Sequence, residues 1–323
     1  MPTSQAALPR ISVLMPAHNA ERYVAAAVRS ALGGGEPNVE VLVVDDGSTD
    51  GTAAAARAIE DPRVTVISIP ASGGPARPRN FALARARAPY LAMLDSDDVL
   101  KPGRLAASAD ALDRFPEASF AFGDFERMDA DGNVFEMSAS YAYPAFRELK
   151  SEPAGVDWRL IPQSELARGL LYGNFIGTSS VVVRRDLVRA LGGFDESLKN
   201  ADDIDLWYRL AHGGAALYSP RVAYSYRVLV NSVARGPPLR TALTRIKVLR
   251  RERARWPDRA ARQQLDRRIA ENLGSIAYQQ RLRRERWLAM GTYLRAFITS
   301  PESRWLTYLF AALLFAREGR TGE

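Results

Sequence analysis

The 323-residue sequence contains no cysteine, which excludes disulfide bonds, thiolate metal sites and cysteine nucleophiles. Histidine is almost as scarce. His18 and His212 are the only two histidines, too few for a histidine-rich zinc site. Metal binding and acid–base chemistry must therefore rest mainly on carboxylates.

Long apolar segments are also lacking. Residues 1–10 have no apolar core and do not resemble a signal peptide. The longest apolar run near a terminus, residues 305–316, spans 12 residues, fewer than a bilayer-spanning helix needs. The expectation is a cytoplasmic protein.

The composition is that of a globular protein, with 47% hydrophobic and 25% charged residues. The net charge of +7 is unevenly distributed. Residues 240–323 carry 19 Lys+Arg and 8 Asp+Glu, a net +11, whereas the remainder carries −4. This asymmetry predicts two parts with different partners. We expect a domain over residues 1–236 and a basic, helical C-terminal region over 237–323, divided at a Gly-Pro-Pro segment.

The first 115 residues alternate apolar, β-rich runs with segments of helical spacing. Each apolar run ends in turn or loop residues, as a buried strand does. This alternation predicts a mostly parallel sheet built from right-handed βαβ units, which is an α/β fold. The expected strands are 11–15, 39–44, 64–69 and 90–94, and the expected helices are 21–32, 53–59, 79–87 and one that starts at 101–102.

Three carboxylates, Asp95, Asp97 and Asp98, directly follow the fourth strand. In open α/β sheets, ligands bind beyond the carboxyl ends of the strands. Asp95 and Asp97 are two residues apart, so in an extended segment they point to the same side. Mg²⁺ and Mn²⁺ prefer such oxygen ligands together with substrate phosphate. The simpler alternative is a polar loop in which Asp98 caps the next helix.

The earlier strands also end in polar groups. His18 and Asn19 follow the first strand, Asp45 and Asp46 the second, and Arg79 the third. Because the carboxyl ends of parallel strands share one edge, these groups predict a nucleotide-type site there. No Gly-x-Gly-x-x-Gly follows the first strand and no Gly-Lys-Ser/Thr loop occurs, which argues against dinucleotide and P-loop sites.

Two more acidic groups lie further along the chain. The segment from Asp129 to Asn133 repeats the Asp-x-Asp spacing, but its Asp-Gly and Gly-Asn pairs predict a hairpin turn. Asp202 and Asp203 begin an amphipathic helix, where acids usually act as caps. Two adjacent acids leave one available as a general base. Further strands are expected at 119–125, 134–137, 177–183, 215–218 and 222–226.

Six segments together resemble glycosyltransferase family 2, in collinear order over residues 11–232. They are I-S-V-L-M-P-A-H-N-A-E-R-Y, V-L-V-V-D-D-G-S-T-D-G-T, A-R-P-R-N-F-A-L-A-R-A, Y-L-A-M-L-D-S-D-D, G-G-F-D-E-S-L and A-D-D-I-D-L-W-Y-R-L-A. The resemblance implies a GT-A fold, with a Rossmann-like, mostly parallel sheet flanked by helices. It also implies a nucleotide-sugar half (residues 10–125) and an acceptor half (126–236). The implied reaction is inverting sugar transfer from a nucleotide-diphosphate sugar, with UDP as the expected nucleotide, to a hydroxyl acceptor.

The resemblance implies roles for individual residues. Asp203 corresponds to the catalytic base and Asp97 to the ligand of a Mn²⁺ or Mg²⁺ ion. Asp46 corresponds to the acid that binds the nucleobase, and Asp95 lies toward the ribose. The residues expected to bind the nucleotide sugar are Pro16, Ala17, His18, Asn19, Asp46, Arg79, Asp95, Ser96 and Asp97, with Asp98, Asp202, Trp207 and Arg227 near donor and acceptor.

The sequence departs from the family pattern at two of these positions and at one other. His18 stands where tyrosine is frequent, and Asp202 where glutamate is common. Leu229 lies two residues after Arg227, where a histidine is frequent. If that histidine helps to hold the metal or diphosphate in relatives, this protein must do so otherwise. The remaining histidine, His212, is expected at a helix C-terminus, where its charge would complement the helix dipole.

Two alternatives come from other classes of protein. A non-catalytic nucleotide-sugar-binding or scaffold subunit is compatible with Leu229 and the basic tail, whereas Asp97 and Asp203 argue for an enzyme. Arginine-rich helices can also bind nucleic acid. Nucleic-acid binding would not explain the acidic residues at the edge of the sheet, so no nucleic-acid partner is expected.

The C-terminal region has two interpretations. Its helices, broken near Trp256-Pro257, pack on the catalytic domain or on a second subunit to form a homodimer. Alternatively, apolar residues between arginines form an interfacial membrane anchor, which would place the protein at the inner face of the membrane. The acceptor, a glycan or a lipid-linked or other hydroxyl compound, is expected to be recognised by residues 138–175 and the tail. The anchor residues are Trp305, Tyr308, Phe310, Leu313 and Phe315.

Overall fold

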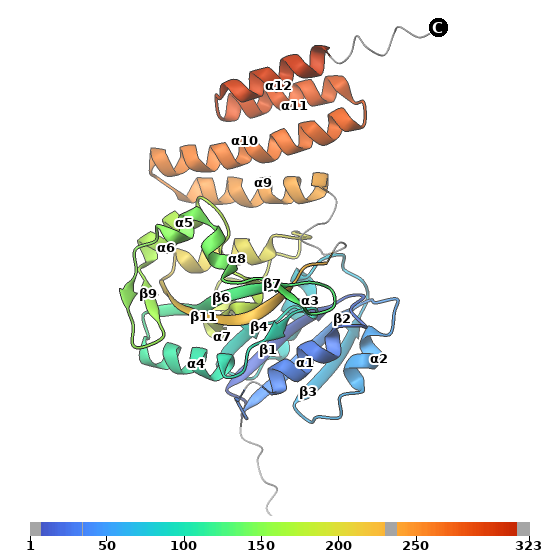
Figure 1. Ribbon diagram of the computed structural model, residues 1–323, viewed down its shortest axis with the longest axis vertical. Helices are drawn as coiled ribbons and strands as arrows, with labels where there is room; N and C mark the ends of the chain where they lie inside the picture. The colour runs from blue at the N-terminus through green and yellow to red at the C-terminus, as the bar shows by residue number, and fades with distance from the viewer. Residues whose placement is uncertain (1–7, 34, 230–237, 315–323) are drawn as a thin grey trace, which may run out of the picture. The chain divides into compact units, whose positions relative to one another are not determined.

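The computed structural model describes residues 8–33, 35–229 and 238–314 (Figure 1). The chain separates into two compact units, the first ending at Leu229. The boundary expected after residue 236 lies within 230–237, outside the described residues. The same is true of Asn231 and Ser232 in the family-like segment, of residues 1–7 and of Phe315.

The first part of the chain forms four parallel strands in the order β3-β2-β1-β4. Val13 pairs with Val41 on one side and with Ala92 on the other. Because the strands run in the same direction, their carboxyl ends meet at one edge of the sheet. The elements are β1 (Ile11–Ala17), α1 (Val24–Leu32), β2 (Val39–Asp46), α2 (Thr52–Arg57), β3 (Val64–Ile69), α3 (Ala76–Arg85) and β4 (Tyr90–Met93).

The sheet continues as β4-β10-β6-β11-β9-β8. Strand β10 runs antiparallel to both β4 and β6, whereas β11 runs parallel to β6. Helices flank this mixed, mostly parallel sheet, which confirms the predicted α/β class. The elements are β5 (Val99–Leu100), α4 (Arg104–Arg114), β6 (Ala118–Met128), β7 (Val134–Glu136), α5 (Pro144–Arg147), β8 (Glu152–Pro153), β9 (Arg159–Ile161), α6 (Gln163–Leu170), β10 (Val182–Arg184), α7 (Arg185–Ala190), α8 (Asp202–Ala211) and β11 (Ala215–Arg227).

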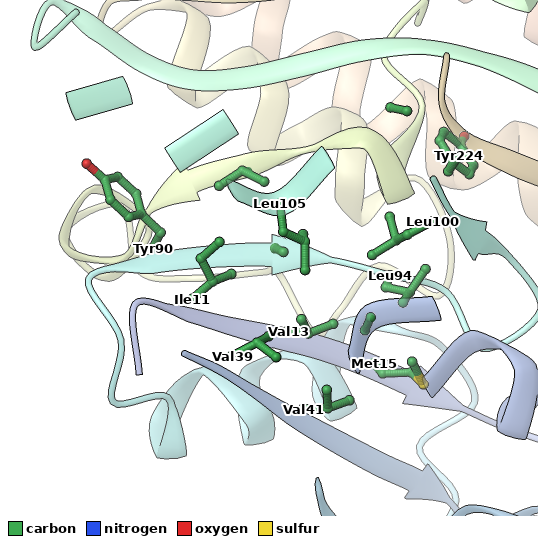
Figure 2. Close-up of a cluster of buried hydrophobic side chains, with 14 of the residues drawn as sticks. Ile11, Val13, Met15, Val39, Val41, Tyr90, Leu94, Leu100, Leu105 and Tyr224 are labelled. Carbon is green, nitrogen blue, oxygen red and sulfur yellow. The ribbon is translucent and has the colours of Figure 1, made fainter. Parts of the chain in front are cut away.

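A hydrophobic core lies on one face of the parallel strands (Figure 2). Ile11, Val13 and Met15 alternate along β1 and therefore share this face. They pack with Val39 and Val41 of β2, and all five side chains are at most 2% exposed. Burial of both sheet faces explains why these strands read as continuous apolar runs in the sequence.

Two predicted strand assignments were wrong in detail. The strand expected over 177–183 begins instead with a 3₁₀ turn, Thr178–Ser180, and only β10 follows it. In this turn the Ser180 N–H donates to the Gly177 carbonyl at 3.0 Å. The strands expected at 215–218 and 222–226 form the single strand β11, with an irregular register between Ser219 and Val222. Pro220 lies in this irregularity, where a residue without an N–H is tolerated.

The described residues of the second unit form four helices, in which each helix packs against the next. The break predicted near Trp256-Pro257 is confirmed. Asp258 caps the following helix by accepting hydrogen bonds from the Ala260 and Ala261 N–H groups. None of the helices in the described residues has the length and apolar character needed to cross a membrane. The helices are α9 (Pro238–Arg255), α10 (Arg259–Leu282), α11 (Arg286–Thr299) and α12 (Ser303–Leu314).

Candidate active site

The loops after β1 and β2 are joined by hydrogen bonds. His18 Nδ1 lies 2.9 Å from the Asp46 carbonyl oxygen; because a carbonyl can only accept, Nδ1 carries the proton. Asn19 has a φ of 49°, and its N–H donates to Ser48 Oγ at 2.9 Å. Its side-chain oxygen accepts from the Thr49 N–H at 2.9 Å. The turn that follows Pro16 and Ala17 therefore lies beside the loop after β2, with the His18 ring exposed.

Asp46 is held from the loop after β3. Its carboxylate accepts hydrogen bonds from the Ser72 N–H and Oγ–H, each at 2.8 Å. Lys199 Nζ donates to the Ser72 carbonyl at 2.8 Å. Sequence reasoning missed Ser72 and Lys199, since neither lies in a recognisable motif. This arrangement fixes the orientation of the acid expected to bind the nucleobase.

The Arg79 side chain links the acidic loop after β4 to the start of helix α8, which are far apart in the sequence. Its Nη2 donates to Asp95 Oδ1 at 2.7 Å and its Nη1 to Asp202 Oδ2 at 2.6 Å. The Arg79 side chain is 4% exposed and that of Asp202 is 2% exposed, so this ion pair is almost fully removed from water. Both terminal nitrogens therefore contact carboxylates, whereas the sequence predicted a contact with the nucleotide.

The loop after β4, which we call the acid loop (Asp95–Asp98), is tied down from two sides. Ser179 Oγ donates to Asp98 Oδ2 at 2.6 Å. The Arg227 N–H donates to Asp98 Oδ1 at 3.0 Å, and Arg227 Nε donates to the Asp97 carbonyl at 2.9 Å. Asp98 is thus a buried anchor of this loop rather than a helix cap.

The Asp97 carboxylate is free of such contacts. No other residue in the described part of the chain donates a hydrogen bond to it. Burial, followed by the neighbouring charge of Asp95, raises the pKa of Asp97 to about 6. Burial and the charge of Asp97 likewise raise the pKa of Asp98. These carboxylates repel one another, and a bound cation would relieve that repulsion.

Asp95 and Asp97 fit a divalent cation that takes part of its coordination from a substrate. Within residues 8–33, 35–229 and 238–314, no three acidic or histidine side chains come together as a metal site. Mg²⁺ needs no such all-protein site, because it commonly binds one or two carboxylates plus phosphate oxygens and water. Leu229 offers no ligand side chain. The donor set is therefore sufficient only together with phosphate or water.

The two acids at the start of α8 differ in burial and in their hydrogen-bond partners. Asp202 is buried with Arg79, and this burial raises the pKa of Asp202 to about 6, although the Arg79 charge opposes the rise. Asp203 is half-buried, and its Oδ2 accepts a hydrogen bond from Thr178 Oγ1 at 2.9 Å. The preceding residue, Ala201, has a φ of 57°, a left-handed conformation that is costly for alanine. Asp202 thus joins the helix to the acid loop, and the Asp203 carboxylate stays accessible.

Trp207 packs in the core and His212 ends helix α8. Trp207 is fully buried and stacks on Phe120 with the ring centroids 6.0 Å apart. The Trp207 ring therefore fixes α8 to β6, and its expected place near donor and acceptor stays a prediction. His212 is the C-cap residue of α8, at the helix end predicted for it.

The second Asp-x-Asp segment is a turn, as predicted. Asp129 Oδ1 accepts from the backbone N–H groups of Asp131 and Asn133, both at 2.9 Å. Arg227 Nη1 donates to the carbonyls of Asp129 and Ala130, each at 3.1 Å. Arg227 therefore joins this hairpin to the acid loop.

A cavity of about 490 Å³ lies in the region expected to recognise the acceptor. Its lining includes Tyr143, Glu148, Glu165 and Tyr172, from α5, α6 and the residues beside them. Burial raises the pKa of the Tyr224 phenol, and the charges of Asp98 and Asp95 in the acid loop raise it further.

The sequence model of glycosyl transferase family 2 matches residues 12–190. The chain belongs to this family. The succinoglycan biosynthesis protein ExoO of Rhizobium meliloti (strain 1021) is 31% identical over 229 residues, which is 71% of this chain. The match spans 63% of that relative, and a match to ExoU of the same organism spans 58%. The chain thus covers about three fifths of these curated relatives.

Two solved structures share the fold. The first is Staphylococcus aureus TarS 1-349 in complex with UDP-GlcNAc, with a TM-score of 0.63 at 19% identity, covering 94% of this chain and 88% of that one. The second is the mannosyltransferase PcManGT from Pyrobaculum calidifontis in complex with GDP-Man and Mn²⁺. Its TM-score is 0.58 at 17% identity, with 96% and 81% covered. These similarities confirm the GT-A fold that the sequence predicts.

Proposed function

We propose that the protein is an inverting glycosyltransferase. It would move a sugar from a nucleotide-diphosphate sugar, with UDP as the nucleotide, to a hydroxyl group of a glycan or lipid-linked acceptor in polysaccharide or glycoconjugate synthesis. One observation carries the proposal: Arg79 bonds both Asp95 of the acid loop and Asp202 at the start of α8. This pair of bonds holds the adjacent Asp203 next to the expected diphosphate end of the donor site.

Asp203 acts as the general base in this proposal. Its half-buried carboxylate is oriented by the Thr178 hydroxyl and removes the proton from the acceptor hydroxyl. The acceptor oxygen then attacks the anomeric carbon from the face opposite the nucleotide diphosphate. The C–O bond to the diphosphate breaks as the new glycosidic bond forms, so the configuration inverts. The proton remains on Asp203 until it passes to solvent.

A Mn²⁺ or Mg²⁺ ion would be held by Asp97, with Asp95 beside it. When bound, the ion supplies positive charge that neutralises the leaving diphosphate. The buried anchors Ser179 and Arg227 fix the backbone of the acid loop, so that the Asp97 carboxylate is presented without rearrangement. PcManGT was solved with Mn²⁺ and GDP-Man, which supports a divalent ion here.

The nucleotide end of the donor belongs to the β1 and β2 loops. Asp46, fixed by Ser72, would accept a hydrogen bond from the base, and the exposed His18 ring offers a stacking surface. This assigns residues 10–125 to the donor and residues 126–236 to the acceptor. The cavity near Tyr143 then lies on the acceptor side. TarS was solved with UDP-GlcNAc, which supports UDP as the nucleotide.

A screen of nucleotide sugars tests this function. With Mn²⁺ present, the cognate donor should stabilise the full chain against heat, and NMR of the transfer product should show inverted anomeric configuration. Retained configuration would refute the mechanism. A donor that binds but is neither transferred nor slowly hydrolysed would support the alternative, a non-catalytic subunit of a glycan-assembly complex.

A peripheral membrane contact is a further part of the proposal, supported by the outer face of α11. Trp287 and Ile298 are each 69% exposed, and Leu288 and Leu294 are 57% and 47% exposed. Arg295 lies on the same face. Such a face fits the interface of a bilayer with anionic lipids. The anchor expected on the last helix is partly wrong, because Trp305 is buried.

Sedimentation with vesicles tests the membrane contact. The full chain should sediment with phosphatidylglycerol-containing vesicles, and the double variant Trp287→Ser/Ile298→Ser should remain in solution. Val156→Ser serves as the control, since Val156 is 99% exposed in the first unit. Light scattering measures whether the protein forms a dimer. If the natural protein is a dimer that does not bind vesicles, and the double variant is a monomer, then a second copy of the chain covers α11.

A further inference from the structure

The second unit contains a cavity of its own, formed by α10, α11 and α12. Its volume is about 420 Å³, within the range of small-ligand sites. The three helices lie side by side (Figure 1). Four aromatic rings dominate the lining: Tyr278, Tyr293, Trp305 and Tyr308. Trp305 and Tyr308 are among the residues that one of the two interpretations of the C-terminal region places in a membrane anchor, and no step of the proposed reaction uses them.

The packing around Trp305 keeps this cavity in shape. A Cβ at Gly274 would lie 2.3 Å from the Trp305 ring, so the ring can approach α10 only because this residue is glycine. Tyr308 packs between Trp305 and Tyr293, with centroid distances of 6.1 and 5.8 Å. The Trp305 Nε1–H is buried, and no hydrogen-bond partner exists for it within the described residues. A buried donor left without a partner is costly.

The two arginines of the cavity differ in whether a carboxylate pairs with them. Arg304 is already paired, with Glu302 at 2.8 Å and with Glu271 at 3.4 Å. Arg281 lies over the Tyr278 ring, 5.3 Å from its centroid, and has no carboxylate partner in the part of the chain that the structure describes. Arg281 and Tyr293 both line the cavity, and the Arg281 charge opposes the rise that burial causes in the pKa of the Tyr293 phenol. The cavity therefore holds one guanidinium available to an anion.

We propose that this cavity binds an acidic sugar residue of the acceptor glycan. The aromatic walls would take the C–H faces of a pyranose ring. The carboxylate would pair with Arg281, whose planar fork matches a carboxylate. The Glu271–Arg304 pair and Ser275 would bind ring hydroxyls. A lipid diphosphate fits less well, because Glu271 lies in the lining and only one guanidinium is unpaired. The acceptor role rests on the proposed function, whereas the binding site itself does not.

Titration calorimetry on the full chain tests the site, with cellobiouronic acid (glucuronyl-glucose) and cellobiose as probes. The acidic disaccharide should bind at least about tenfold more tightly, because a charge-assisted pair is lost with cellobiose. Arg281→Gln should weaken binding of the acid about tenfold or more and leave cellobiose unaffected. Arg283→Gln is the matched control, since Arg283 is exposed and near Arg281.

Three results would overturn the inference. They are equal affinity for both disaccharides, unchanged binding in Arg281→Gln, and inorganic phosphate binding as tightly as the sugar acid, which would indicate a general anion site. Binding and transfer by the natural protein separate the two proposals. Tight binding of the sugar acid by a natural protein that transfers sugar from no nucleotide sugar would refute the proposed function and leave this site standing.

Discussion

Replacement of Arg79 by methionine tests how the site is held together. The change keeps most of the side-chain volume but removes the positive charge between Asp95 and Asp202. Asp202 would then remain in a position where its side chain is 2% exposed without a counter-charge. Removing one partner of a buried pair costs about 3–5 kcal/mol. We expect this loss in the unfolding free energy of the first unit at pH 8.

The loss should depend on pH in a defined direction. Burial raises the folded-state pKa of Asp202 to about 6, above the ordinary value of about 3.9. A raised carboxyl pKa lowers stability as pH rises, by about 2 kcal/mol for this group between pH 4 and 7. Without Arg79, which lowers the pKa, the value rises further. At pH 5 Asp202 is mostly protonated in both proteins, so the difference should fall below about 2 kcal/mol.

Urea unfolding at pH 8 and pH 5, followed by circular dichroism, measures both quantities. Arg77→Met is the matched control, because Arg77 is exposed on the same helix and its replacement should change stability by less than about 0.5 kcal/mol. A loss that is equal at both pH values would refute the role of the Asp202 charge. A loss no larger than that of the control would refute the buried ion pair.

Three further predictions concern the same site. Chelation with EDTA should abolish sugar transfer, and added Mn²⁺ or Mg²⁺ should restore it; transfer that persists in metal-free buffer would contradict the role given to Asp97. Thr178→Val removes the hydrogen bond to Asp203 and should lower kcat about tenfold with KM for the donor unchanged, as steady-state kinetics would reveal. Ala201→Gly removes the cost of a left-handed alanine and should raise the unfolding free energy by about 1 kcal/mol; a lower value in urea unfolding would mean that the φ of 57° carries no strain.

The sequence predicted the donor half of the fold well because three of its strands, β1, β2 and β4, are buried on both faces. Apolar runs such as Val41–Val44 and Tyr90–Met93 are hard to mistake when polar residues follow them. The acceptor half was harder. The 177–183 segment contains strand-forming residues, but Ser179 and Ser180 bond to nearby groups and shorten the strand. The irregular register of β11 depends on pairing with β6, which local sequence does not encode.

The candidate site was predictable as a set of strand-end loops, but its internal bonds were not. Nothing in the sequence spacing indicates that Arg79 contacts Asp202, 123 residues away. Ser72 and Lys199 were missed for the same reason, because they act through contacts between loops. The burial of Trp207 was not predicted either, because an aromatic residue beside a predicted base is equally compatible with a surface or a core position. Such distinctions depend on tertiary packing.

The most direct test of the central claim is a paired measurement on Asp203→Asn. Asparagine keeps the shape of the side chain and can still pair with the Thr178 hydroxyl, but it cannot accept a proton as a base. The donor affinity, measured by calorimetry with Mn²⁺ present, should equal that of the natural protein, while sugar transfer becomes undetectable. Transfer at the natural rate by Asp203→Asn would contradict the account, because the proposed base would then have no part in the reaction.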